Sequence, residues 1–273
     1  MFGINLHSVI PMRSEAREQA EMCSQLLFGE TFEIVEKTND WYLIQNRSDG
    51  YRGWIDGKMA EILSEEELIN LEKNNSVVVN YPFAIAEVEH NHTKERSATA
   101  PPSLENIILT GGSILYNYNT KKECAVFAGK TYYISKALVN IHSKPITASN
   151  LVSFAILYQN SPYLWGGKNV LGIDCSGFVQ VVFRIGGIML PRDCSQQVEK
   201  GKVVDFLQEA QTGDLAFFEN KEGKISHVGI LINNTYIIHA SGRVKIEAID
   251  TEGIISEIDG NYTHRLRVIK RII

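Results

Sequence analysis

Short hydrophobic runs interrupted by polar residues fill the first segment of the chain. The stretches "TFEIVEK", "WYLIQN" and "YRGWID" mix β-branched and aromatic residues with polar ones. Turn-forming residues separate them, at Thr38-Asn39-Asp40 and at Ser48-Asp49-Gly50. Short strands at this spacing are typical of a small β-barrel, which we predict over residues 1–63.

A helical period replaces this alternation after residue 63. Ser64 and Glu67 form a capping-box pattern, and Leu68 and Leu71 lie on one helical face. The pattern predicts a linker helix within residues 64–75.

A second β-rich segment follows at residues 76–144. Its strand-like runs are "VVVNYPFAIAEVE", "SILYNY", "CAVFAG" and "TYYIS", which predict a second small barrel. The polar stretch "HNHTKERSATAPPS" inside this segment carries two prolines and predicts a loop.

The hydrophobic period changes again in the last segment, residues 145–273. The stretch "TASNLVSFAILYQN" has hydrophobic residues at helical spacing, and "CSGFVQVVFRIGG" predicts a helix that ends at Gly-Gly. The apolar face of that second helix is made of Phe178, Val179, Val182 and Phe183. Five strand-like runs follow: "DLAFF", "SHVGILI", "TYIIHAS", "VKIEAI" and "HRLRVIKRI". Helices followed by a run of strands indicate an α+β domain.

Composition narrows the class of protein without identifying it. The chain has 273 residues, enough for more than one domain, and its 22% charged and 44% hydrophobic residues are ordinary globular usage. The 27 basic and 32 acidic residues leave a net charge of −5, which gives no electrostatic case for nucleic acid or an anionic membrane. We therefore expect binding to neither. We also expect a monomer, although the sequence itself does not report the oligomeric state.

The ends and the cysteines bear on the compartment. The opening "MFGINLHSV" is typical of a first strand and lacks the basic and apolar regions of a signal peptide. Four cysteines, none in a C-x-x-C pair, do not form a disulfide framework; they are Cys23, Cys124, Cys175 and Cys194. We expect the protein to be located in the cytoplasm. Export, with a leader that has been trimmed from this sequence, stays open as an alternative.

The stretch "YLWGGKNVLGIDCSGF", residues 163–178, carries the first candidate chemistry. A phosphate loop is excluded, because Asn169 follows Gly167 and Lys168 where Ser or Thr is needed and the upstream glycine is missing. A zinc site is disfavoured, because Cys175 has no Cys or His partner nearby in sequence. A buried, inert thiol and a nucleophile remain.

The residues around Cys175 favour the nucleophile. Asp174-Cys175-Ser176-Gly177 is polar and rich in small residues, like a helix N-terminus. Unpaired N–H groups and the positive end of the helix dipole favour thiolate at such a position.

Two histidines on adjacent predicted strands supply a candidate base. Each of them, His227 in "SHVGI" and His239 in "IIHAS", would alone be read as a core histidine. A two-residue turn would put them on opposite faces of the sheet. A three-residue loop at 233–235 places His227 opposite Ser241 and leaves His239 diagonally across on the same face. A Cys–His–His relay therefore requires the odd-length loop.

These motifs resemble those of a known family. Residues 150–270 are similar to the NlpC/P60 cysteine peptidases, which have a papain-like core and cleave cell-wall peptides. The likeness is carried, in the family's order, by "YLWGG", "DCSGF", "LPRDCSQQ", "TGDLAFF", "SHVGI" and "IIHAS". The first segment resembles bacterial SH3-like (SH3b) barrels through "QLLFGETFEIVEKTNDWYLIQ" and "YRGWI", and the second segment matches less well. Two such barrels ahead of this domain resemble the layout of the γ-D-glutamyl-L-diamino acid endopeptidases of the dipeptidyl-peptidase VI type.

The resemblance implies a role for each matching catalytic position. Cys175 matches the nucleophile, His227 the base and His239 the residue that orients the base. Tyr163 matches the tyrosine that supports the oxyanion, and its alternative is a core aromatic.

Further positions match the lining of the substrate cleft. Asp174, Ser176 and Arg192 are among them, and Trp165 is a candidate pocket wall. Asp174 alternatively complements the charge of a helix start, and Arg192 alternatively makes a surface ion pair. Cys194 stands where the family commonly has serine, which weakens hydrogen bonding to substrate and places a second thiol where it could oxidise with Cys175.

The implied substrate carries a free N-terminal amine. In similar endopeptidases the first barrel supplies a tyrosine and an acid that hold the amine of L-Ala, and the candidates here are Tyr51 and Glu15, with Glu18 and Glu21 as rivals for the acid. Without the resemblance, Tyr51 would be read as a barrel-surface aromatic and Glu15 as a solvated charge.

The sequence thus predicts a cysteine endopeptidase that needs no cofactor and cuts the γ-D-Glu–diamino acid bond of stem peptides during murein peptide recycling. One alternative is another papain-like acyl-transfer enzyme, an amidase or acyltransferase. The other is a catalytically silent cell-wall peptide-binding protein, against which the Cys175–His227–His239 set argues. The preference between diaminopimelate and lysine stays open.

Overall fold

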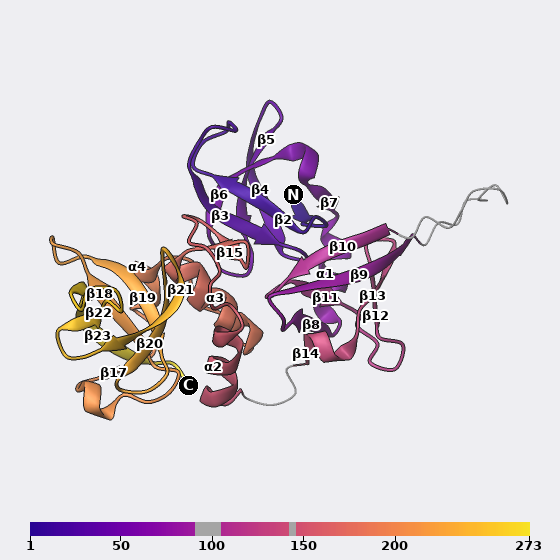
Figure 1. The fold of residues 1–273 in the computed structure, drawn as a ribbon. Helices are drawn as coiled ribbons and strands as arrows, with labels where there is room; N and C mark the ends of the chain where they lie inside the picture. The colour runs from indigo at the N-terminus through magenta and orange to yellow at the C-terminus, as the bar shows by residue number, and fades with distance from the viewer. Residues whose placement is uncertain (91–104, 142–145) are drawn as a thin grey trace, which may run out of the picture. The chain divides into compact units, whose positions relative to one another are not determined.

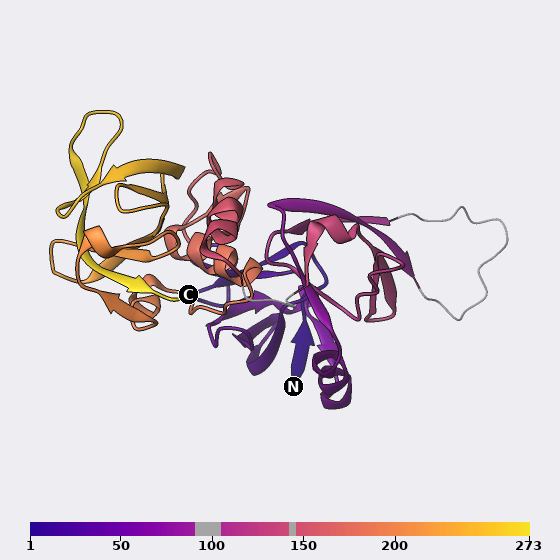
Figure 2. The ribbon, with the colours of Figure 1, turned by 90° about the horizontal axis from the view of Figure 1, so that it is seen from below.

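The computed structural model describes residues 1–90, 105–141 and 146–273 (Figures 1 and 2). The chain forms two compact units. The first comprises Met1–Glu21, Leu26–Ser48 and Arg52–His142; the second comprises Met22–Gln25, Asp49–Tyr51 and Ser143–Ile273. Two short N-terminal segments therefore belong to the second unit. The loop predicted from "HNHTKERSATAPPS" lies outside the described residues, apart from His90.

The first segment forms a seven-stranded antiparallel sheet in the order β3-β2-β6-β5-β4-β1-β7. Its strands are β1 (Phe2–Ile4), β2 (Val9–Arg13), β3 (Met22–Leu27), β4 (Thr31–Thr38), β5 (Trp41–Asn46), β6 (Arg52–Asp56) and β7 (Glu61–Leu63). Side chains alternate along β4, where Phe32 and Ile34 are buried and Glu33 and Val35 are exposed. The three strands predicted from the alternating runs are confirmed.

Helix α1 (Glu65–Lys73) begins where the capping box predicts. The Ser64 hydroxyl accepts a hydrogen bond from the Glu67 amide at 3.2 Å, and the Glu67 carboxylate accepts one from the Ser64 amide at 2.8 Å. Leu68 and Leu71 are buried, as their shared face predicts.

The second β segment forms two small sheets, in the orders β10-β9-β13-β12 and β11-β8-β14. The strands are β8 (Ser76–Val79), β9 (Phe83–His90), β10 (Glu105–Thr110), β11 (Ile114–Tyr116), β12 (Cys124–Phe127), β13 (Lys130–Tyr133) and β14 (Val139–Asn140). Phe28, which precedes β4, packs edge-on against Phe127 and Tyr132, with ring centroids 5.8 and 5.2 Å away. The two β segments of the first unit therefore share one hydrophobic core.

The second unit combines three helices with a second seven-stranded sheet, in the order β17-β23-β18-β19-β20-β21-β22. An additional β22–β23 pairing closes the last six strands of that order into a barrel. The helices are α2 (Ala148–Ile156), α3 (Cys175–Ile185) and α4 (Cys194–Gln197). The strands are β17 (Lys202–Val204), β18 (Leu215–Glu219), β19 (Ile225–Leu231), β20 (Tyr236–Ser241), β21 (Arg243–Ile249), β22 (Gly253–Ile255) and β23 (Tyr262–Arg271), with a short hairpin of β15 (Lys168–Asn169) and β16 (Gly172–Ile173). The predicted α+β fold class is confirmed.

Helix α3 is buried along its whole length, so the prediction of a single apolar face was too narrow. It lies beside α2 and against β19 and β20 (Figure 1). The polar side chain of Gln180 is accommodated because its amide donates to the Leu190 carbonyl at 3.0 Å and to Asp49 at 2.9 Å. The packing brings the first residue of α3, Cys175, to the sheet. Among the described residues, no helix has the length and apolar character needed to cross a membrane.

Candidate active site

Cys175 is the first residue of α3, as predicted. Asp174 caps the helix, and its carboxylate accepts a hydrogen bond from the Gly177 amide at 2.7 Å. The Cys175 side chain is nearly buried and borders a cavity of about 290 Å³. The other residues that line this cavity are Tyr163, Ser226, His227, Ala240, Ser241, Gly242 and His264.

The loop between β19 and β20 has the odd length that the relay requires. Gly229 pairs with His239 and Leu231 with Ile237, and continuing this register places His227 opposite Ser241. His227 Nε2 and His239 Nδ1 are 2.9 Å apart, and both side chains are buried. The predicted shared face of the two histidines is confirmed.

The thiol and the imidazole form a neutral pair. Cys175 hydrogen bonds with Cys194 and with His227; the Cys194 bond and burial raise the pKa of the Cys175 thiol, although His227 acts in the opposite direction. Burial lowers the pKa of His227 to about 4, so the imidazole is a free base at neutral pH. The helix start, which favours thiolate, is therefore opposed by burial and by the hydrogen bond with the second thiol, which both raise the pKa of Cys175.

Cys194 is the first residue of α4, and its sulfur lies 4.0 Å from the Ile225 carbonyl oxygen. Its hydrogen bond to Cys175 places it beside the candidate nucleophile. Contact with substrate and oxidation with Cys175 stay predictions for this residue.

Tyr163 lies outside the barrel strands, in the segment between α2 and β15, and it borders the same cavity as Cys175. Its backbone amide donates to the Gly242 carbonyl at 2.9 Å, which ties the segment to the turn between β20 and β21. Burial, followed by the nearby Cys175, raises the pKa of Tyr163 to about 12. The phenol therefore stays protonated and can donate a hydrogen bond to a developing oxyanion.

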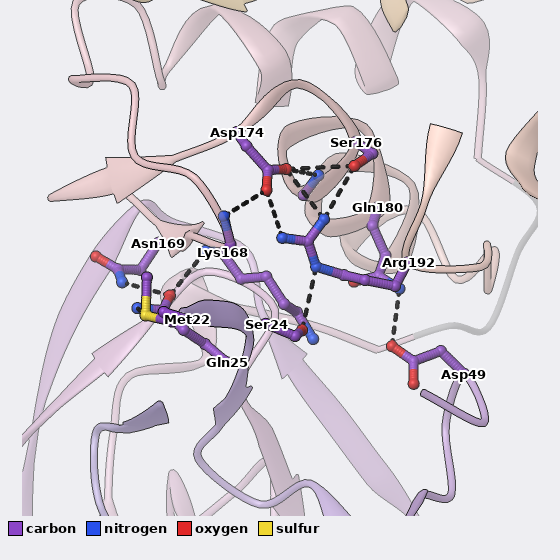
Figure 3. A network of polar contacts seen from close by, with 12 residues as sticks. Met22, Ser24, Gln25, Asp49, Lys168, Asn169, Asp174, Ser176, Gln180 and Arg192 are labelled. Carbon is purple, nitrogen blue, oxygen red and sulfur yellow. Dashed lines mark hydrogen bonds and ion pairs between the residues drawn. The ribbon is translucent and has the colours of Figure 1, made fainter. Parts of the chain in front are cut away.

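Arg192 and Asp174 form a buried ion pair (Figure 3). Nη1 and Nη2 of Arg192 lie 3.0 and 2.5 Å from the two carboxylate oxygens of Asp174. Nη1 also donates to the Ser176 hydroxyl at 2.9 Å, and Nε donates to the Ser24 hydroxyl at 3.1 Å. Arg192 is 1% exposed. The alternative of a surface ion pair was therefore wrong, because all three guanidinium nitrogens have partners inside the protein. Contact of Arg192 with substrate stays a prediction.

The Asp174 carboxylate is equally occupied. It accepts five hydrogen bonds: from the amides of Gly166 and Gly177, from the Ser176 hydroxyl and from two nitrogens of Arg192. The predicted charge complementation of the helix start is present. Asp174 and Ser176 are both buried, and their contact with substrate stays a prediction.

Replacing Arg192 with leucine is expected to lower the free energy of unfolding by about 3–5 kcal/mol, because the Asp174 carboxylate would remain buried without its counter-charge. Arg47→Leu is the matched control: its bidentate pair with Glu72 is partly exposed and is expected to be worth under about 1 kcal/mol. Denaturant titration measures both, and equal losses would contradict the assignment of a buried pair.

Two N-terminal segments belong to the second unit, and Tyr51, in one of them, lies close enough to Arg192 and Asp174 for their charges to affect its pKa. The Gln25 side chain accepts from the Lys168 amide at 2.7 Å and from the Asn169 side chain at 3.0 Å (Figure 3). Tyr51 is half-buried, and its pKa is raised to about 12 by burial and then by the charge of Asp193. The structure thus brings Tyr51 to the second unit.

Two further predicted substrate residues, Glu15 and Trp165, stay predictions. Glu15 belongs to the first unit, where it is exposed and pairs with Arg17 at 2.9 Å. Trp165 is 62% exposed and does not border the cavity at Cys175.

Two residues that the sequence did not indicate lie against the histidines. His264, on β23, stacks on His227 with ring centroids 4.1 Å apart. Glu247, on β21, lies with Oε2 2.9 Å from His239 Nε2. Both stand in strand-like runs, His264 in "HRLRVIKRI" and Glu247 in "VKIEAI", but in none of the family motifs, so no signal in the sequence identified them as site residues. Over residues 1–90, 105–141 and 146–273, no group of three or more His, Cys, Asp or Glu side chains is arranged to hold a metal ion.

A thiol at a helix start, hydrogen bonded to a neutral imidazole that a second imidazole orients, is the machinery of a papain-like cysteine peptidase. Residues 160–265 match the model of the NlpC/P60 family, and residues 12–58 match that of the bacterial dipeptidyl-peptidase SH3 domain. The domain that carries Cys175 belongs to the NlpC/P60 family of cysteine peptidases.

Similar proteins extend beyond this domain. A γ-D-glutamyl-L-lysine dipeptidyl-peptidase of Bacillus cereus is 29% identical over 252 residues, which cover 87% of this chain and 73% of that protein. Dipeptidyl-peptidase 6 of Lysinibacillus sphaericus is 27% identical, over 92% of this chain and 93% of its own. A crystal structure of an NlpC/P60 family protein from Bacillus cereus matches with a TM-score of 0.82 at 19% identity, covering 100% of this chain and 99% of that one. This last likeness shows a shared fold.

Proposed function

We propose that this protein hydrolyses the bond between γ-D-Glu and a diamino acid in peptidoglycan stem peptides that begin with a free L-Ala. The observation that carries the proposal is the relay of Cys175, His227 and His239 at a cavity bordered by a protonated Tyr163. Two relatives that cover most of this chain are named for dipeptidyl-peptidase activity, one of them on a γ-D-glutamyl-L-lysine bond, and this supports the choice of substrate.

The neutral pair at Cys175 and His227 sets the order of proton transfers. Because His227 Nε2 faces His239, the other ring nitrogen, Nδ1, takes the thiol proton as the sulfur attacks the γ-carbonyl carbon of D-Glu. The carbonyl oxygen becomes an oxyanion that accepts a hydrogen bond from Tyr163. The imidazolium then gives its proton to the leaving amine of the diamino acid, and a thioester forms. His227 next takes a proton from water as the water oxygen attacks the thioester carbon. The C–S bond then breaks, L-Ala-γ-D-Glu is released, and the imidazolium returns the proton to the Cys175 sulfur.

Tyr51 and Asp193 are the groups that we assign to the free amine. Asp193 is half-buried beside Tyr51, and although it is the N-cap residue of α4, its side chain makes no capping hydrogen bond. Burial raises the pKa of Asp193, an effect that Arg192 only partly offsets. A substrate ammonium group would supply a counter-charge for the Asp193 carboxylate, and it would donate a hydrogen bond to the Tyr51 hydroxyl. Asp174 already accepts five hydrogen bonds, and its role here is to hold Arg192, the residue before Asp193, in place.

Acetylating the N-terminus of a stem tripeptide is expected to lower kcat/KM by roughly a hundredfold, because a charge-paired amine is lost. Asp193→Asn should bring the kcat/KM values of the free and acetylated peptides closer together, because it weakens cleavage of the free peptide alone. Mass spectrometry of matched free and acetylated peptides, each with lysine or diaminopimelate at the third position, measures both effects and the side-chain preference. Equal cleavage of both forms, or efficient digestion of intact wall, would contradict the proposal.

We further propose that the enzyme acts in the cytoplasm on recycled wall fragments. None of the four cysteines, all of which lie in the described residues, forms a disulfide, and this suits a reducing compartment. Fractionation of cells with an antibody to the native protein tests this, and recovery outside the inner membrane would overturn it.

A further inference from the structure

The relay continues one residue beyond His239. The His239 and Glu247 side chains are both completely buried, with His239 Nε2 2.9 Å from Glu247 Oε2. The second carboxylate oxygen, Oε1, lies 3.0 Å from the Lys245 ammonium and accepts from the Glu257 amide at 3.2 Å. Glu247 sits on β21, one strand further from Cys175 than His239 on β20. Four side chains thus form a line from the thiol into the barrel wall.

The charge state of Glu247 determines where the protons of this line lie. Burial alone would raise the pKa of Glu247, but hydrogen bonds from His239, Lys245 and the Glu257 amide outweigh it and lower the pKa to about 2. The group is therefore a carboxylate, which only accepts hydrogen bonds, so His239 Nε2 carries a hydrogen. Burial lowers the pKa of His239, which leaves its ring neutral and its Nδ1 unprotonated.

The tautomer of His239 in turn sets that of His227. Since His239 Nδ1 accepts, the bond of 2.9 Å between the two rings is donated by His227 Nε2–H. The free lone pair of neutral His227 is then on Nδ1, the nitrogen left for Cys175. We propose that Glu247 is a positioning residue of this catalytic relay, which through His239 keeps the proton-accepting nitrogen of His227 directed at the thiol. The inference rests on the proposed peptidase function only for its kinetic consequence.

The same arrangement stabilises the charge that forms during the reaction. When His227 takes the thiol proton, its positive charge lies in line with His239 and the buried Glu247 carboxylate. The other titratable groups that face the two rings are His264 on β23 and Lys245 on β21, and both act to lower the pKa of a neighbouring histidine. The Glu247 carboxylate at the end of the line acts in the opposite direction and raises the pKa of His239.

Glu247→Gln tests the assignment because the substitution keeps the shape of the side chain. The amide oxygen is expected to turn toward Lys245 and the Glu257 amide, which both donate, and the amide nitrogen then faces His239 Nε2. His239 must switch to the Nδ1–H tautomer, and His227 must place its hydrogen on Nδ1, toward Cys175. We expect kcat to fall by at least roughly a hundredfold with little change in KM, as for other relays locked in a wrong tautomer.

The readouts separate this idea from the substrate assignment. Nitrogen NMR of the imidazoles should show His239 Nε2 protonated in the wild type and unprotonated in Glu247→Gln, and alkylation of Cys175 by iodoacetamide should slow by roughly tenfold or more. Neither readout uses a peptide, so both hold if the stem-peptide proposal fails. Glu219→Gln, which alters a carboxylate on β18 that pairs with Arg265 and Arg267, is the matched control. A folded Glu247→Gln variant with the wild-type tautomer and alkylation rate would show that Glu247 serves only Lys245.

Discussion

Replacing Cys175 with alanine is expected to abolish peptide cleavage and to leave the fold intact. The thiol supplies the atom that forms the covalent intermediate, and without it the relay of His227 and His239 has no nucleophile to activate. Removing such a nucleophile typically lowers kcat by roughly 10⁴-fold or more. The substitution deletes one sulfur from a side chain that borders a cavity, so the unfolding transition should move little.

The other cysteines provide controls for this experiment. Cys23→Ala and Cys124→Ala should retain activity, because Cys124 is buried in the first unit and neither residue borders the cavity at Cys175. Initial rates and unfolding midpoints of the three variants decide the matter. Retained cleavage by Cys175→Ala would remove the nucleophile assignment.

Replacing His227 with glutamine is expected to lower kcat by roughly 10³-fold or more, since the neutral thiol then has no base. The alkylation of Cys175 should slow in parallel, because it also requires loss of the thiol proton. A matched change at a histidine outside the site, His7→Gln, should leave both rates unchanged. A His227→Gln variant that keeps either rate would show that another group takes the proton.

The low pKa of His227 also predicts how the kcat/KM of the wild-type enzyme depends on pH. A histidine in an unfolded chain titrates near pH 6.5, whereas burial lowers the pKa of His227 in the folded protein to about 4. The base therefore stays unprotonated as the pH falls through 6.5, and kcat/KM should decline only as the pH approaches about 4. An acid limb near pH 6.5 would contradict the buried, neutral imidazole.

The lowered pKa of His227 also makes the folded protein less stable as the pH falls below 6.5. Between pH 6.5 and about 4 the unfolded chain takes up a proton at His227 that the folded protein does not. The contribution of this group to stability is therefore complete above pH 6.5 and is lost as the pH falls, by about 3 kcal/mol once the pH is below 4. The activity limb is thus best measured at short times, before the protein unfolds.

Features set by neighbours in the chain were predictable from the sequence. The capping box at Ser64 located α1 to the residue, and the small polar residues after Asp174 located the start of α3. The parity of the loop after β19 was enough to place His227 and His239 on one face, because side chains alternate strictly along strands. Local rules carry these cases.

Features set by residues far apart in the chain were not predictable. Arg192 is buried because Ser24 and Asp174 meet its guanidinium, and Ser24 lies 168 positions away. His264 reaches His227 because β23 pairs with β18, which in turn pairs with β19. Glu247 reaches His239 only through the register of β20 and β21. The pKa of Cys175 likewise depends on burial and on Cys194, neither of which a helix-start pattern contains.

The account is tested most directly by mass spectrometry of one defined substrate, L-Ala-γ-D-Glu-diamino acid-D-Ala, cleaved in water enriched in heavy oxygen. The products are expected to be the dipeptide L-Ala-γ-D-Glu, with heavy oxygen in its γ-carboxylate, and an unlabelled peptide that begins with the diamino acid. Wild-type enzyme should form them, and Cys175→Ala should not. Cleavage at another bond, transfer of the acyl group to an acceptor other than water, or the same products from Cys175→Ala would contradict a cysteine peptidase that cuts after γ-D-Glu.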